Sequence, residues 1–133
     1  MRFQVSREIA FDYLVDPHHR PEWQSSLSRV EEVTGEPRVG QRWVDVTKPG
    51  VRPLMETTEL VRPTRWTERG TWRSFAAVLT LTFTEADGGC EVAVDMRLEG
   101  RGLARPAAAI LNLASPAAVR SDLRRAARIL ATR

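Results

Sequence analysis

The chain of 133 residues contains a single cysteine, Cys90, and only two histidines, the adjacent pair His18 and His19. One cysteine cannot form a disulfide within the chain, and no other cysteine or histidine stands at a metal-ligand spacing from these residues. We therefore expect no disulfide framework, no metal site and no cofactor. The two histidines are interpreted as surface residues rather than as a catalytic base.

Long apolar runs are also lacking. No stretch approaches the roughly 20 residues of a membrane-spanning helix. The N-terminus, where Arg2 is followed by mixed residues, has no apolar segment typical of a secretory signal. Since 42% of the residues are hydrophobic and the length suffices for a real core, we expect one cytoplasmic globular domain over residues 1–133.

Lysine is almost absent, and the positive charge is unevenly distributed. Lys48 is the only lysine beside nineteen arginines, and from Arg101 onward seven arginines face one acid, Asp122. That segment carries +6, while the first 100 residues carry −3. A basic face can bind nucleic acid or an anionic surface. No nucleic-acid motif accompanies it, so we interpret it as a solvated helix face and expect no nucleic-acid partner.

The C-terminal stretch has the clearest helical pattern in the chain. Its last 17 residues carry apolar side chains at steps of 4, 3 and 4, which make one stripe on a helix: Val119, Leu123, Ala126 and Leu130. Arg120, Arg124 and Arg128 lie away from that stripe. Between residues 107 and 114 only Asn112 is polar, which predicts a helix buried on most sides.

A break in this pattern falls at Ser115 and Pro116. Serine is a good N-cap and proline suits the first helical position, whereas the residue before a proline leaves the helical region. The stretch is therefore either one kinked helix or two shorter helices that meet near Ser115. We favour a kink or a short break in one continuous path.

Alternating apolar residues ahead of this helix predict a series of strands. Their ranges are Arg2–Val5, Leu27–Thr34, Gln41–Lys48, Leu54–Val61, Trp66–Trp72, Ser74–Thr84 and Glu91–Glu99. Two short helices are predicted after the first strand, over Arg7–Val15 with Ser6 as N-cap and over His18–Trp23. Short turns between consecutive strands favour an antiparallel meander. The long C-terminal helix must then cover one face of the sheet.

Five segments carry a resemblance to a known family: FDYLVDP at residues 11–17, PEW at 21–23, VGQRW at 39–43, ELVRPTRW at 59–66 and ADGGCEV at 86–92. Together with the order of elements, they resemble the START-like, or Bet v 1-like, helix-grip superfamily, in particular its polyketide cyclase/dehydrase (SRPBCC) group. Ser6 stands where that family usually has a proline. The resemblance implies an α+β fold in which a curved antiparallel sheet of about six or seven strands wraps around the long C-terminal helix.

The same resemblance implies a cavity between the sheet and the C-terminal helix. Members of this superfamily bind lipids, sterols, polyketides and other apolar molecules, and some catalyse cyclisation or dehydration. We expect the cavity to be lined by Trp43, Met55, Trp66, Phe75, Leu79, Met96, Ile110 and Leu113. The tryptophans are also interpreted as core residues, which is the commoner role of aromatics in a domain of this size.

Two strand acids are the candidates for chemistry. If Trp43 and Trp66 face inward, strand alternation places Asp45 and Glu68 inward too, where either could act as a general acid or base. A buried acid needs a partner, and Arg69 points to the opposite face of its strand. The favoured alternative is that a twist or bulge lets each acid reach solvent at the cavity mouth.

Three functions are consistent with these patterns. The first is binding of a hydrophobic small molecule or lipid by a monomer or homodimer. The alternative is a polyketide cyclase or dehydratase that uses Asp45 or Glu68. A third is an interaction protein that uses the arginine face of the C-terminal helix.

Overall fold

The computed structural model of the chain describes residues 1–100 and 115–133. Its elements are β1 (Arg2–Phe3), α1 (Arg7–Val15), η1 (Pro17–His19), α2 (Arg20–Trp23), β2 (Leu27–Glu31), β3 (Arg42–Thr47), β4 (Leu54–Val61), β5 (Arg65–Trp72), β6 (Phe75–Ala86), β7 (Gly89–Gly100) and α4 (Pro116–Ala131). No helix within these two segments is long and apolar enough to cross a membrane.

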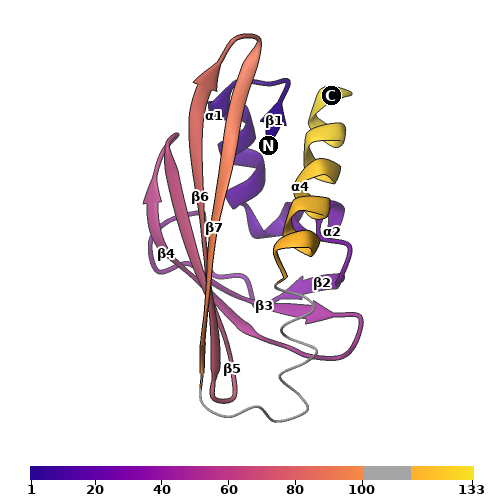
Figure 1. The fold of residues 1–133 in the computed structure, drawn as a ribbon. Coiled ribbons are helices and arrows are strands. Elements are labelled where there is room, and N and C mark those ends of the chain that lie inside the picture. The colour runs from indigo at the N-terminus through magenta and orange to yellow at the C-terminus, as the bar shows by residue number, and fades with distance from the viewer. Residues whose placement is uncertain (101–114) are drawn as a thin grey trace.

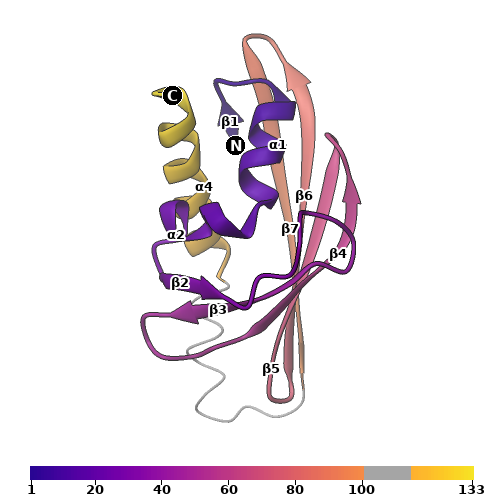
Figure 2. The ribbon, with the colours of Figure 1, turned by 180° about the vertical axis from the view of Figure 1, so that it is seen from behind.

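The strands form one seven-stranded sheet in the order β1-β7-β6-β5-β4-β3-β2, and every pair is antiparallel. Strands β2 to β6 each pair with the next strand in sequence, and β1, the first strand of the chain, pairs with β7 at the edge of the sheet. Figure 1 shows the long β6–β7 hairpin and the helices on one side of the sheet, and Figure 2 shows the same arrangement from behind. The predicted α+β meander is confirmed.

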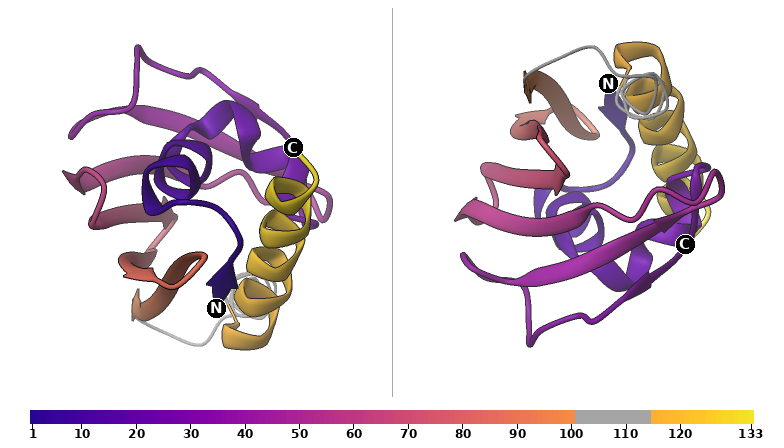
Figure 3. Two further views of the ribbon diagram at one scale, coloured as in Figure 1. Left: turned by 90° about the horizontal axis from the view of Figure 1, so that it is seen from above. Right: turned by 90° about the horizontal axis from the view of Figure 1, so that it is seen from below.

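The sheet curves around the helices, as the end-on views in Figure 3 show. Irregular pairing falls between Leu27 and Arg29 in β2 and between Thr57 and Glu59 in β4. Such bulges bend a strand and increase its twist. The sheet therefore has a concave face that packs against α1, α2 and α4, which is the predicted helix-grip arrangement.

Helix α1 has the boundaries that its local sequence predicts. The Oγ of Ser6 accepts a hydrogen bond from the backbone N–H of Ile9 at 3.3 Å, which caps the first turn. Asp16 ends the helix because it precedes Pro17 and adopts an extended conformation. Its carboxylate then accepts a hydrogen bond from the N–H of His18 at 3.0 Å and so caps η1.

Helix α4 begins at the predicted break. Ser115 is its N-cap, whose Oγ accepts a hydrogen bond from the N–H of Ala118 at 3.1 Å, and Pro116 occupies the first turn. The predicted stripe is buried at Leu123, Ala126 and Leu130 and half-buried at Val119, while the predicted outer residues Arg120, Arg124 and Arg128 are exposed. The expected helix over residues 107–114 and the kink into it lie outside the described residues.

The hydrophobic core fills the end of the sheet near β1 and α1. Phe83 of β6 and Phe11 of α1 meet edge to face with ring centroids 5.1 Å apart, and Leu123 of α4 joins the same cluster. Farther along β7 the apolar side chains become more exposed, with Val94 at 37% and Leu98 at 46%. The described residues thus fill the opposite end of the concave face less completely than the core end.

Candidate functional site

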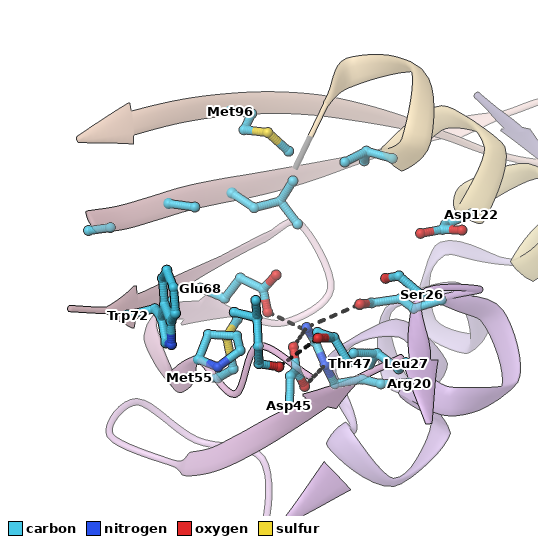
Figure 4. Close-up of a pocket in the computed structure, with 18 of the residues that line it drawn as sticks. Arg20, Ser26, Leu27, Asp45, Thr47, Met55, Glu68, Trp72, Met96 and Asp122 are labelled. Carbon is cyan, nitrogen blue, oxygen red and sulfur yellow. Dashed lines mark hydrogen bonds and ion pairs between the residues drawn. The ribbon is translucent and has the colours of Figure 1, made fainter. Parts of the chain in front are cut away.

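A cavity of about 130 Å³ lies at this less filled end, between the concave face of the sheet and the helices α2 and α4. One wall is apolar and comes from strands β4 to β7: Met55, Trp72, Phe75, Leu79 and Met96. We call these five residues the apolar wall. Figure 4 shows Met96 across the cavity from a group of charged side chains around Arg20.

Those charged side chains form a buried ionic cluster of Arg20, Asp45 and Glu68. The Nε and one Nη of Arg20 donate hydrogen bonds to the two carboxylate oxygens of Asp45 at 3.1 and 2.7 Å. The other Nη donates to Oε2 of Glu68 at 2.8 Å. The three residues are 2%, 4% and 6% exposed, so the guanidinium joins two carboxylates away from bulk water.

Three separate elements bring this cluster together. Asp45 lies on β3 and Glu68 on β5, on either side of β4, and both side chains share the concave face. Arg20 is the first residue of α2, which follows η1 and packs on the concave face of the sheet. Its guanidinium also lies over the ring of Trp43, 5.0 Å from the centroid, and the indole N–H of Trp43 donates to Asp45 at 3.0 Å.

Burial and pairing with Arg20 have opposite effects on the pKa of the Glu68 carboxyl. Desolvation raises its pKa and the nearby negative charge of Asp45 adds to that effect, while Arg20 lowers it; the net pKa lies above the ordinary value of 4.5. One oxygen is directed at Arg20, and Figure 4 shows the other directed away from it. That second oxygen, Oε1, accepts no hydrogen bond from the described residues.

A further carboxyl, that of Asp122 on α4, also lines the cavity. Its Oδ1 accepts hydrogen bonds from the N–H and the Oγ of Ser25 at 3.2 and 3.1 Å. Desolvation raises the pKa of Asp122 above its ordinary value, against the lowering effect of these two hydrogen bonds. Arg20, Asp45, Glu68 and Asp122 are together called the polar end of the cavity.

Only some of the side chains predicted to line the cavity do so in the structure. Met55, Phe75, Leu79 and Met96 line the cavity, whereas Ile110 and Leu113 lie outside the described residues. Trp43 and Trp66 are not among the lining residues. Both are completely buried in the core, where each indole N–H is already bonded, Trp43 to Asp45 and Trp66 to the hydroxyl of Thr57 at 3.1 Å.

Both candidate acids face inward, as strand alternation predicts. The favoured alternative, in which they reach solvent, is wrong, because Arg20 supplies the partner that makes their burial possible. His18 is exposed and bonds to Asp16, and His19 stacks on Tyr13; neither lines the cavity.

Sequence reasoning missed Arg20 and Asp122. One signal could have pointed to a residue such as Arg20: two acids that face inward need a cation, and their own strands supply none on that face. The position of Arg20 on the concave face depends on how the four-residue helix α2 packs, and no periodic sequence pattern reveals that packing. Asp122 was visible as the one acid of the arginine-rich segment, and it falls beside Leu123 on the inward face of α4.

The chain belongs to the family described as polyketide cyclase / dehydrase and lipid transport, whose model matches residues 1–133. The predicted membership is therefore confirmed. Membership implies, in general terms, a protein that binds a hydrophobic ligand. A comparison with curated protein sequences finds no match.

Solved structures share the fold at low sequence identity. Protein MLL2253 from Mesorhizobium loti has a TM-score of 0.74 at 16% identity, with 99% of this chain and 93% of that chain covered. The crystal structure of Ara h 8.0201 has a TM-score of 0.73 at 14% identity, with 100% of this chain and 95% of that chain covered. Protein BH1534 from Bacillus halodurans has a TM-score of 0.72 at 12% identity, with 98% of this chain and 92% of that chain covered. At these identities the likeness supports the fold alone.

Proposed function

We propose that this protein binds a small apolar molecule in the cavity between the apolar wall and α4. The observation that carries the proposal is the combination of one apolar wall with a few buried polar groups at the other end. Sites for small molecules are typically concave, largely apolar and supplied with a small number of placed polar groups. Family membership supports the same class of ligand.

The volume of the cavity between the described residues favours a small molecule. About 130 Å³ is below the roughly 300–1,000 Å³ of sites for larger ligands. It is close to the roughly 150 Å³ of an engineered cavity in another protein that holds benzene. A molecule with one ring, or a short branched chain, therefore fits better than a whole lipid.

Binding of toluene tests the proposal directly. We expect the wild-type protein to bind toluene in a saturable manner, measured by NMR chemical-shift titration. Replacement Ala77→Phe adds a ring to a residue that lines the cavity and should abolish binding. Ala93→Phe is the matched control, because Ala93 is an exposed residue of the neighbouring strand β7 and should leave binding unchanged.

Two results would overturn this function: no saturable binding by the wild type, or equal binding by the Ala77→Phe variant. Native mass spectrometry of the purified protein adds the identity of any molecule retained from the cell. A retained molecule much larger than one ring would contradict the proposed size.

A cyclase or dehydratase is a second candidate, and Glu68 is the observation that favours it. A general acid needs a pKa near the working pH, and burial raises that of Glu68. Asp45 suits this role less, because Arg20 and Trp43 occupy both of its oxygens. An NMR titration of the side-chain carboxyls tests the idea. A Glu68 pKa at or below 4.5 would remove its support.

A further inference from the structure

We infer that the ligand carries one hydroxyl group on its apolar body, and that the cavity rejects a carboxylate of the same size. The inference rests on the proposed function and adds the chemical class of the ligand. It follows from the charge of the polar end and from the hydrogen-bonding groups that the described residues leave unused.

The polar end, as the described residues form it, holds three carboxyl groups and a single guanidinium. With Asp45, Glu68 and Asp122 ionised, three negative charges face the single positive charge of Arg20, and the net charge is −2. With Glu68 and Asp122 protonated, the net charge is zero. The charge of Arg20 is already directed at two carboxylates. Among the described residues a carboxylate ligand would therefore find no free cation, and burial of an unpaired charge is strongly unfavourable.

Hydrogen-bond acceptors remain open at the polar end. The described residues donate to Oε2 of Glu68 and to Oδ1 of Asp122, and they donate nothing to the second oxygen of either carboxyl. An ionised carboxyl offers this oxygen as an acceptor, and a protonated carboxyl offers an O–H donor. A hydroxyl group can form a hydrogen bond with either form, because it both donates and accepts.

An unused donor is also present. Trp23 lines the cavity and is 2% exposed, and its indole N–H has no acceptor among residues 1–100 and 115–133. Buried N–H groups in folded proteins nearly always find a partner. A hydroxyl group can accept from a donor of this kind and can also donate to a carboxylate, whereas neither a protonated amine nor a hydrocarbon can accept a hydrogen bond. A hydroxyl is thus the small group whose chemistry suits both kinds of open site.

Three probes of one ring each separate the possibilities: toluene, benzyl alcohol and benzoate. At pH 7 we expect the wild type to bind benzyl alcohol about tenfold more tightly than toluene, because a hydrogen bond to a buried carboxyl replaces an unpaired group. Benzoate should bind at least about 100-fold more weakly than benzyl alcohol, because its charge is buried without a counter-ion. Dissociation constants from NMR titration measure each value.

Two variants locate the effect. Glu68→Gln and Trp23→Phe should each reduce the preference for benzyl alcohol over toluene, with toluene binding as the internal control in the same variant. Glu56→Gln is the matched control for the carboxyl, because Glu56 pairs with Arg42 at an exposed position outside the cavity and should leave all three constants unchanged. If a variant fails to fold, the three wild-type constants still decide the question.

Benzoate binding as tight as that of benzyl alcohol would overturn the inference. So would toluene binding at least as tightly as benzyl alcohol; the cavity would then be an apolar site without a use for its polar end, and the proposed function would stand. Failure of all three probes to bind would overturn both the inference and the proposed function.

Discussion

At Arg20 one guanidinium holds two carboxylates inside the protein. Moving such ions out of water costs several kcal/mol each, and only close pairing with further hydrogen bonds offsets that cost. Both conditions are met, because the Arg20–Asp45 and Arg20–Glu68 distances are 2.7 and 2.8 Å and Trp43 adds a hydrogen bond to Asp45. Each member of the cluster therefore depends on the others for its burial.

Removal of the guanidinium should be costly. In an Arg20→Met variant, Asp45 and Glu68 would remain buried without a cation, and we expect a loss of about 3–5 kcal/mol in the free energy of unfolding. Urea denaturation at pH 7 measures it. Arg52→Met is the matched control, because Arg52 pairs with Glu31 at an exposed site and such pairs contribute about 0–1 kcal/mol. Equal losses in the two variants would contradict the role assigned to the cluster.

Asp122 gives a prediction on pH dependence. Its pKa is raised in the folded protein, so the folded state holds this proton more tightly than the unfolded state does. The associated stability is present below the ordinary value of 3.8 and is lost as the pH rises through the folded-state pKa. Asp122→Asn keeps an oxygen for Ser25 but cannot titrate.

The Asp122→Asn variant should therefore gain stability relative to the wild type as the pH rises from about 4 towards neutrality. Urea denaturation at several pH values measures the difference between the two proteins. A difference that is constant across this range would show that Asp122 has an ordinary pKa. A difference of opposite slope would show that the hydrogen bonds from Ser25 outweigh the effect of burial.

At the scale of elements, α4 joins the core and the cavity through one face. Leu123, Ala126 and Leu130 pack into the hydrophobic core, and Val119 and Asp122 line the cavity. The arginines on the other face are exposed, which agrees with a solvated surface. A helix with this pattern gains most of its stability from packing of its apolar face.

Truncation of that face tests the placement of α4. Leu123 is 1% exposed, and Leu123→Ala should lower the free energy of unfolding by about 2–5 kcal/mol, through lost burial and the cavity left behind. Leu54→Ala is the matched control, because Leu54 is 48% exposed on β4 and should cost well under half as much. A Leu123→Ala variant that unfolds at the wild-type urea concentration would show that α4 packs differently.

For the whole molecule, the order of elements could be predicted because its signals are local. Caps, prolines and period-two alternation gave α1 and β4 with the observed ends. Strand β2 was predicted to reach Thr34, and that end is wrong. Glu32 has a φ of 54°, which is incompatible with extended backbone, and the strand stops at Glu31. A positive φ at a residue other than glycine leaves no mark in an alternation pattern.

The site was less accessible than the fold for a physical reason. Alternation gives the face of a strand residue, so the inward positions of Asp45 and Glu68 followed from their own strands. The cluster becomes stable only when Arg20 arrives from a helix 25 and 48 residues away in sequence. That contact depends on tertiary packing, as does the distinction between tryptophans that line the cavity, such as Trp72, and those that fill the core.

The final prediction couples the cavity to the stability of the whole fold. Its walls come from α2, α4 and strands β2 to β7, so the cavity exists only when these elements are assembled. A ligand that binds only the folded state stabilises it by mass action, by about 2.7 kcal/mol at a concentration 100 times its dissociation constant. For a domain of this size, that corresponds to a rise of roughly 10 °C in Tm.

Scanning calorimetry with toluene measures this rise. The Ala93→Phe variant should show the same increase as the wild type, because its exposed ring leaves the cavity open. Ala77→Phe should show no rise in Tm, because its ring occupies the space that toluene needs. The same variant reveals any general effect of toluene on unfolding. If Tm rose equally in Ala77→Phe and the wild type, toluene would be acting elsewhere on the folded protein. The cavity would then have no part in the stabilisation.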